Sequence, residues 1–209
     1  MEVLPENNQL YGEQDYWESR YVSENESTTF DWFKGFDDLH DTFTLVLDNK
    51  SGSILHLGCG NSSLGEDMHH AGWTQIVNVD YSPAVIETMA RRCDGLAGLT
   101  WQIADIFLLD ELYPAGYFDY AIDKGTLDAL LTVKHDPWNP PKDLCSKIFR
   151  YIEQVSKVLK KGGKFLHITF AQPHFRRSFL EIPDFKVSTL TLVGKGGGFE
   201  YFAYVCEKL

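Results

Sequence analysis

The fold is decided by the stretch Ile54-Leu55-His56-Leu57-Gly58-Cys59-Gly60-Asn61-Ser62. The apolar run over 53–57 is typical of a buried strand, and the glycines after it predict a tight turn before a helix. Glycine suits this turn because it has no Cβ, so the backbone can bend sharply and a ligand can approach closely. The N-terminus of the helix offers free N–H groups to an anionic ligand group. A Gly-x-Gly pattern alone is as often only a tight turn.

Asp80 strengthens this pattern. It lies twenty residues after Gly60, at the end of a strand expected over 76–79. An acidic residue at this place accepts hydrogen bonds from ribose hydroxyls in nucleotide-binding sheets. The glycine turn and Asp80 together predict a cofactor that carries adenosine.

The kind of cofactor follows from what the turn lacks. Ser63 stands where a dinucleotide fingerprint needs a third small residue, and the next glycine is Gly65. A ligand without a pyrophosphate does not require that third glycine. Asp105, at the end of a third expected strand, can meet an adenine amine. An antiparallel hairpin expected at the C-terminal end, over 187–193 and 199–206, also departs from the plain dinucleotide fold. Together these features favour S-adenosylmethionine.

Strands and helices alternate along the chain, which predicts a mostly parallel sheet. Strands are expected at 53–57, 76–79, 99–103, 118–122 and 165–170, and a closing antiparallel hairpin at 187–193 and 199–206, joined by glycine-rich residues 194–198. We therefore expect an α/β fold, a doubly wound, Rossmann-like, seven-stranded sheet with helices on both faces. One domain is expected over 1–209, with a helical lid in 1–50 and the Rossmann-like core in 51–209.

Local signals place the helices. A capping box is expected over 63–66, and residues 82–83 fit the cap and first position of another helix. Apolar residues over 144–159 predict a long amphipathic helix, with the lysines and glycines of 160–163 forming its C-terminal end. A loop is expected over 173–183.

The charge distribution limits the expected partners. The 209 residues carry 30 acidic and 19 basic side chains, for a formal net charge of −11. Residues 1–50 hold twelve of the acids and three of the bases. Nucleic acid is not an expected partner, because a phosphate backbone requires a basic surface. The acidic surface fits a basic protein substrate, although such surfaces also serve simply to keep a protein in solution.

The composition also bears on location. No apolar stretch reaches eighteen residues, so no membrane-spanning helix is expected. The first residues lack the basic and apolar regions of a secretory signal. The four cysteines are far apart and form no CxxC pair, which favours free thiols in a reducing cytosol and argues against a metal site. We expect a cytoplasmic monomer.

Six segments occur in an order that is characteristic of a known family; they are Tyr16-Trp17-Glu18-Ser19-Arg20-Tyr21, Phe30-Asp31-Trp32-Phe33, 57–62, 79–82, 123–130 and 173–176. With them the chain resembles the class I, seven-stranded S-adenosylmethionine-dependent methyltransferases. Within that superfamily it is similar to the methyltransferase-like group that modifies lysines of translation elongation factor 1-alpha. The Trp-x-x-Arg-Tyr opening and the Lys-Gly-Thr-Leu-Asp-Ala run carry this closer likeness. His56 departs from the many class I enzymes with an acidic residue there, so we expect it to be a buried structural histidine.

The resemblance implies how the cofactor is held: glycines beside the methionine portion, acids and neighbouring side chains at the ribose and adenine, a lysine near the methionine, and an aromatic N-terminal lid. The implied cofactor-binding residues are Trp17, Tyr21, Phe30, Gly58, Gly60, Asp80, Tyr81, Asp105, Ile106 and Lys124. From the sequence alone, Trp17 and Tyr21 fit at least as well one helix face packed on the sheet. Lys124 equally fits a solvated surface lysine.

The substrate-side candidates are Asp123 and Asp128, near the carboxyl end of the fourth expected strand, and His174 on the same rim. Asp128 fits a helix-capping acid equally well, and His174 can simply fix its loop. No catalytic residue is assigned, because methyl transfer from a sulfonium mainly requires positioning. The sequence thus predicts an S-adenosylmethionine-dependent methyltransferase acting on a protein lysine, with elongation factor 1-alpha as the implied partner. Methylation of a small molecule, or cofactor binding without turnover in an interaction protein, remain open alternatives.

Overall fold

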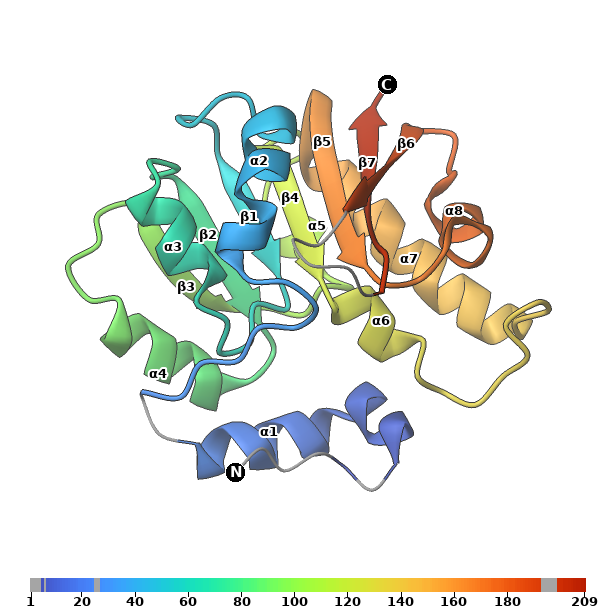
Figure 1. Ribbon diagram of the computed structural model, residues 1–209, viewed down its shortest axis with the longest axis horizontal. Coiled ribbons are helices and arrows are strands. Elements are labelled where there is room, and N and C mark those ends of the chain that lie inside the picture. The colour runs from blue at the N-terminus through green and yellow to red at the C-terminus, as the bar shows by residue number, and fades with distance from the viewer. Residues whose placement is uncertain (1–4, 6, 25–26, 193–198) are drawn as a thin grey trace.

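A seven-stranded mixed sheet forms the centre of the protein (Figure 1). The computed structural model describes residues 5, 7–24, 27–192 and 199–209. The strands are β1 (Ile54–Leu57), β2 (Ile76–Asp80), β3 (Leu99–Ile103), β4 (Phe118–Lys124), β5 (Leu159–Thr169), β6 (Phe185–Leu192) and β7 (Tyr201–Lys208). Their order across the sheet is β3-β2-β1-β4-β5-β7-β6.

The pairing directions confirm the predicted fold class. β1 pairs in parallel with both β2 and β4, while β7 lies between β5 and β6 and is antiparallel to both. The strand order reverses direction at β1 and β4, and open α/β sheets bind ligands at the carboxyl ends of strands at such a point. The glycine-rich connection expected at 194–198 lies outside the described residues.

Helices cover both faces of the sheet (Figure 1). One face carries α2 (Phe36–Val46), α3 (Leu64–His70) and α4 (Pro83–Arg92); the other carries α5 (Leu109–Leu112), α7 (Lys142–Val158) and α8 (Pro173–Leu180). The core on the α7 side includes Phe118, Tyr151 and Phe165, all fully buried. The core on the α2 side is built around Phe43 and Trp73. The sheet is therefore held rigidly between two apolar layers, and its carboxyl edge can present a site.

The boundary between α7 and β5 differs from the prediction. The helix ends at Val158, and residues 160–163 belong to the strand rather than to a helix terminus. Leu159 is fully buried and pairs with Phe118 of β4, while the register shifts between Phe118 and Tyr120. Pairing with β4 therefore outweighs the local helix-ending signal of the lysines and glycines.

Two helix starts also test the local signals. Ser82 caps α4 as predicted, since its hydroxyl accepts a hydrogen bond from the backbone N–H of Val85 at 3.4 Å. The capping box over 63–66 is wrong, because the Ser63 hydroxyl donates to the carboxylates of Asp31 and Asp67 instead. The loop expected over 173–183 is also wrong: a proline at the first position of α8 starts a helix there.

A separate helical layer lies across the carboxyl ends of the parallel strands (Figure 1). It consists of the 3-10 helix η1 (Asn8–Gly12) and α1 (Gln14–Ser23). All residues of α1 are described and none is buried, whereas α2 contributes Leu39 and Phe43 to the core. The segment expected as one lid over 1–50 therefore consists of two parts. The part before α2 lies outside the core, and α2 itself belongs to the core. In the described part of the chain, no helix is long and apolar enough to cross a membrane.

Candidate active site

A pocket opens at the carboxyl ends of β1, β2 and β4, below the N-terminal layer. All ten residues expected to bind the cofactor line it, namely Trp17, Tyr21, Phe30, Gly58, Gly60, Asp80, Tyr81, Asp105, Ile106 and Lys124. These residues come from six separate regions of the chain. The topology therefore brings together every member of this predicted set.

The glycine turn forms the floor of the pocket. Gly58 and Gly60 have positive φ angles of 57° and 50°, which side chains rarely adopt. A Cβ at Gly58 would lie 2.1 Å from Oγ1 of Thr126, and one at Gly60 would lie 2.7 Å from the hydroxyl of Tyr21. Both positions require glycine, and the turn presents bare backbone to the pocket.

Asp80 is the buried anion of the pocket. Its Oδ2 accepts the backbone N–H of Gly60 and its Oδ1 accepts that of Ser82, both at 3.0 Å. Burial raises the pKa of this carboxyl to about 6, although the backbone hydrogen bonds oppose the shift. Each carboxylate oxygen retains a lone pair, so the group can accept two further hydrogen bonds from hydroxyls.

The side wall after β2 and β3 is mainly apolar. Tyr81, Ile106 and Phe107 line it, and the hydroxyl of Tyr81 donates to the backbone oxygen of Gln14 at 3.3 Å. Oδ1 of Asp105 accepts the backbone N–H of Phe107 at 2.8 Å, so this carboxylate shapes the loop. The wall suits a flat aromatic ligand group beside a hydroxyl-binding carboxylate.

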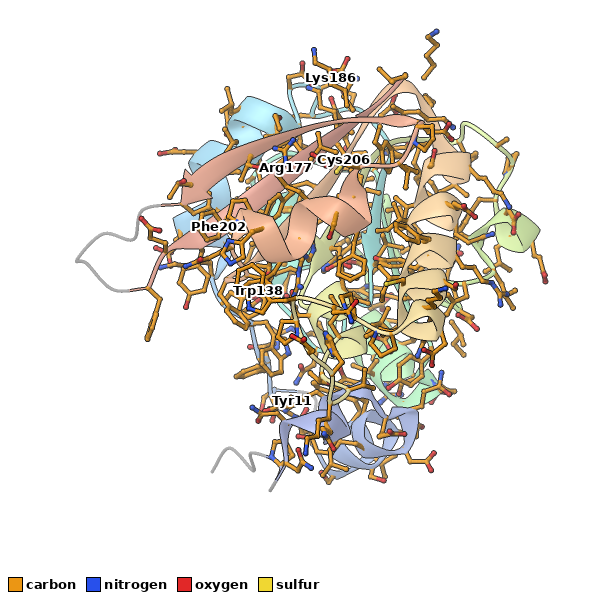
Figure 2. The ribbon with its side chains drawn as sticks, turned by 90° about the vertical axis from the view of Figure 1, so that its right-hand side faces the viewer. Tyr11, Trp138, Arg177, Lys186, Phe202 and Cys206 are labelled. Atoms are coloured by element: carbon orange, nitrogen blue, oxygen red, sulfur yellow. The ribbon has the colours of Figure 1, made fainter. Side chains whose placement is uncertain are left out.

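Aromatic side chains of the N-terminal layer cover the pocket. The rings of Trp17 and Tyr21 stack with centroids 5.7 Å apart, and Nε1 of Trp17 donates to the backbone oxygen of Tyr11 at 2.7 Å. Figure 2 shows Tyr11 in the helical layer at the bottom of that view. The guanidinium of Arg20 lies 5.1 Å from the ring centre of Phe30. Trp17 and Tyr21 thus both line the pocket, and Tyr21 also packs against the core cluster of Cys59 and α4.

Lys124, the last residue of β4, has a role that the sequence did not indicate. Its Nζ donates to Oδ1 of Asp31 at 2.8 Å and to the backbone oxygen of Trp32 at 3.0 Å, and its side chain is only 2% exposed. Asp31 also accepts hydrogen bonds from Ser62 and Ser63, which follow the glycine turn. Lys124 therefore lines the pocket but directs its charge at residues 30–34, which we call the strap.

Burial disfavours the charged forms of both Asp31 and Lys124. Burial raises the pKa of Asp31, but the ammonium of Lys124 and the hydrogen bonds outweigh it, and the net pKa is lowered. Burial lowers the pKa of Lys124 more than Asp31 restores it. Asp31 and Trp32 were missed as site residues, although both lie in the 30–33 segment that carries the family resemblance.

The substrate-side role expected for Asp123 is wrong. Its side chain is fully buried, accepts hydrogen bonds from the hydroxyl of Tyr151 at 2.7 Å and from the backbone N–H of Leu127 at 3.0 Å, and pairs with Nδ1 of His167 at 3.1 Å. A substrate cannot reach a carboxylate enclosed in this way. Asp123 instead fixes the first turn of α6 (Thr126–Leu130) to β5 and α7.

Asp128 and His174 also lie outside the pocket. Asp128 forms no helix-capping hydrogen bond; its Oδ1 accepts hydrogen bonds from Arg176 and Thr169 at 2.5 and 2.6 Å, while its Oδ2 has no hydrogen-bond partner among the described residues. Its substrate-side role stays a prediction. His174 is exposed and stacks on Trp138 with ring centroids 5.2 Å apart (Trp138 is labelled in Figure 2). Its substrate-side role stays a prediction.

His56 is buried, as expected, although it also lines the pocket. It is 3% exposed, its Nδ1 bonds Oδ1 of Asn78 at 2.9 Å, and burial lowers its pKa to about 4. The histidine is therefore neutral at physiological pH, and it fixes β1 to β2 beneath the glycine turn.

The pocket fits S-adenosylmethionine on chemical grounds. A buried carboxylate with spare lone pairs matches the two ribose hydroxyls, the side wall after β3 matches the adenine, and the bare glycine backbone leaves space for the methionine portion. Aromatic side chains of the N-terminal layer line the same space. The hydrogen-bonding groups, the free space and the burial of the pocket all fit this cofactor.

Comparisons with known proteins support the same conclusion. Residues 48–185 match the family described as a methyltransferase domain. EEF1A lysine methyltransferase 4 of Bos taurus is 35% identical over 205 residues, covering 98% of this chain and 79% of that protein. The Mus musculus protein of that name is 37% identical over 176 residues, covering 83% of this chain and 67% of its own.

A solved structure shares the fold. The N-methyltransferase NodS from Bradyrhizobium japonicum WM9, in complex with S-adenosyl-l-homocysteine, superposes with a TM-score of 0.58 at 13% identity, covering 91% of this chain and 96% of that chain. This structure shows the fold alone, whereas the family match and the curated relatives also show the family. The chain belongs to the methyltransferase-domain family, together with these EEF1A lysine methyltransferases, and is an S-adenosylmethionine-dependent methyltransferase.

Proposed function

We propose that this enzyme methylates the ε-amino group of a lysine in a protein, and that translation elongation factor 1-alpha is the substrate to test first. The observation that carries the proposal is the likeness, over 98% of the chain, to a protein named for that activity. The acidic N-terminal fifty residues add support, because they complement a basic protein surface.

The ten pocket residues divide the binding work in this proposal. Asp80 accepts hydrogen bonds from the ribose hydroxyls, and Gly58 and Gly60 admit the methionine portion against the backbone. Trp17 and Tyr21 cover the pocket and exclude water. When bound, S-adenosylmethionine supplies an electrophilic methyl group on a sulfonium that is its own leaving group.

The protein's part in the transfer is positioning. A lysine nucleophile must arrive unprotonated, and an apolar, aromatic pocket favours the neutral amine by desolvation. Trp32, which lines the pocket beside Gly125, supplies such a wall. Lys124, paired with Asp31 at 2.8 Å, holds this wall in place. We also propose that the enzyme acts in the cytoplasm as a monomer.

A labelling assay tests the proposal. Purified enzyme, tritiated S-adenosylmethionine and recombinant elongation factor 1-alpha are incubated, and the modified residue is located by mass spectrometry. We expect label on one or few lysines, and we expect its loss with Asp80→Asn enzyme. A parallel incubation replaces the recombinant protein with a cytosolic extract. Label found there only in small solutes would favour small-molecule methylation, and cofactor binding without any labelled product would favour an interaction protein.

A further inference from the structure

The backbone at Phe33 is unusual. Among the residues that the structure describes, Phe33 is the only non-glycine with a positive φ, 64°. The backbone N–H of Lys34 donates to the oxygen of Trp32 at 2.7 Å, which closes a tight three-residue turn around Phe33. Such a conformation costs about 1–3 kcal/mol and persists only where its surroundings enforce it. Here Lys124 holds the oxygen of Trp32 from below.

The strained turn brings two neighbouring aromatic rings of the strap to different surroundings. Trp32 lines the pocket, whereas the half-buried Phe33 contacts Phe170 and Tyr201, with ring centroids 5.4 and 6.0 Å away. Phe170 directly follows β5 and is 56% exposed. We call Phe33, Phe170 and Tyr201 the aromatic rim. The rings of Trp32 and Phe33 are 6.0 Å apart, so aromatic surface continues from the pocket to solvent.

The aromatic rim already holds an ammonium group. Nζ of Lys34 lies 5.1 Å from the ring centre of Tyr201 and 3.5 Å from Oδ2 of Asp38. An aromatic face combined with a carboxylate is the chemistry that binds lysine and arginine side chains. Exposed acids lie beside the rim in sequence, namely Asp37, Asp38, Asp41 and Glu200. The rim therefore complements a cationic chain and would repel an acidic one.

We propose that the aromatic rim docks the basic segment of the protein substrate that carries the target lysine, an inference that rests on the proposed lysine methylation. Cationic side chains flanking the target bind over the exposed face of Phe170 and compete with Lys34 for the ring of Tyr201. The target lysine extends past Trp32 into the pocket. The strain at Phe33 is the means by which one short strap forms both the pocket wall and the docking surface.

Phe170→Ala tests the proposal, because its exposed ring can be removed without opening the core. With elongation factor 1-alpha as substrate, we expect KM for the protein to rise about threefold to tenfold. The kcat at saturating substrate and the affinity for S-adenosylhomocysteine should stay unchanged. Phe170→Tyr should restore KM, and Phe170→Leu should not, since it keeps apolar bulk without an aromatic face. An unchanged KM in Phe170→Ala overturns the proposal.

Tyr117→Ala is the matched control. Tyr117 is 49% exposed, but it directly precedes β4 and so lies at the amino end of that strand, whereas the pocket lies at the carboxyl ends. This variant should leave all constants unchanged.

A second measurement does not depend on elongation factor 1-alpha. The peptide acetyl-Gly-Lys-Gly-Lys-Gly-amide is titrated into the full-length enzyme while the ring protons of Phe33, Phe170 and Tyr201 are followed by NMR. We expect shifts with this peptide and none with its glutamine counterpart. If elongation factor 1-alpha is not methylated, that result rejects it as the substrate, and shifts confined to these rings would still support the docking surface. The absence of shifts would then reject both.

Discussion

Asp31 and Lys124 are 93 residues apart in the chain, yet the carboxylate of one lies 2.8 Å from the ammonium of the other. The lysine side chain is 2% exposed and the aspartate side chain 20%. Because Asp31 also binds Ser62 and Ser63, this pair fastens the strap to the glycine turn and to the end of β4 together. This ion pair is thus one of the contacts that hold the wall of the pocket.

Asp31→Asn should be strongly destabilising. The substitution leaves the ammonium of Lys124 buried without a counter-charge, and breaking a buried pair in this way costs about 3–5 kcal/mol. The partial exposure of Asp31 places the expected loss at the lower end of that range. Urea denaturation measures it as a lower midpoint at an unchanged slope.

Lys157→Met provides the comparison for this prediction. Lys157 pairs with Asp110 at 2.7 Å, but the two side chains are 53% and 39% exposed. Exposed pairs contribute about 0–1 kcal/mol, so this variant should be nearly as stable as the parent. Equal losses in the two variants would show that the Asp31–Lys124 pair has no special role.

Cofactor affinity should depend on pH through Asp80. Because its pKa is raised from 3.8 to about 6, the folded protein takes up a proton as the pH falls through 6. By itself this group makes stability decrease as the pH rises from 3.8 to 6, since the folded state favours the protonated acid. Cofactor binding has the opposite sign, because the ribose hydroxyls need the carboxylate as acceptor.

Calorimetry with S-adenosylhomocysteine from about pH 5 to about pH 8 checks this sign. We expect the dissociation constant to rise roughly tenfold per pH unit below pH 6. Asp80→Asn should bind weakly at every pH, because each lost hydrogen bond to a carboxylate is worth about 1.5–3 kcal/mol. A flat profile in the parent protein would contradict the assignment of Asp80 as the ribose anchor.

Gly58→Ala should be more costly than Gly95→Ala. Both glycines have positive φ, 57° and 85°, so alanine is strained by about 1–2 kcal/mol at either position. A Cβ at Gly95 meets open space, whereas one at Gly58 meets Thr126 at 2.1 Å. Thermal denaturation should show a modest loss for Gly95→Ala and a clearly larger one for Gly58→Ala. Similar losses would mean that the turn can move away from Thr126.

Deleting residues 1–22 should weaken cofactor binding while the sheet stays folded. The deletion removes Trp17 and Tyr21 from the pocket, and none of the residues of α1 is buried in the core. Calorimetry measures the affinity, and circular dichroism verifies the fold. Unchanged affinity would show that the N-terminal layer does not act as a lid.

Methylation of a basic protein should weaken with salt in the full-length enzyme. Exposed acids attract such a substrate over distances that salt screens beyond about 8 Å at physiological ionic strength. Binding of S-adenosylhomocysteine should change much less, because its partners lie at short range. Initial rates at low substrate concentration, measured across a salt series, distinguish the two. Rates that do not change with salt would reject electrostatic steering.

The sequence predicted those parts of the fold that depend on local pattern. β3 occupies the expected 99–103, and Ser82 caps α4, because alternation of polarity and a Ser-Pro start are local signals. The end of α7 could not be predicted in the same way. It is set by pairing of Leu159 with Phe118, a contact made 41 residues away in the chain.

The pocket residues likewise divide into those that the sequence could place and those that depend on distant contacts. Gly58, Gly60 and Asp80 could be placed because the carboxyl ends of parallel strands meet at one edge. Asp123 also lies at a strand end, but its partners Tyr151 and His167 follow 28 and 44 residues later and enclose it. A single sequence does not show which carboxylates at such an edge are enclosed by later elements.

The position of β7 between β5 and β6 bears on how the chain folds as it is synthesised. β6 emerges from the ribosome first, yet every ladder hydrogen bond it makes is to β7. Until residues 201–208 are available, β6 has no strand partner on either edge and β5 lacks one neighbour. Open strand edges are prone to wrong pairing. We therefore expect nascent chains halted before β7 to require chaperones.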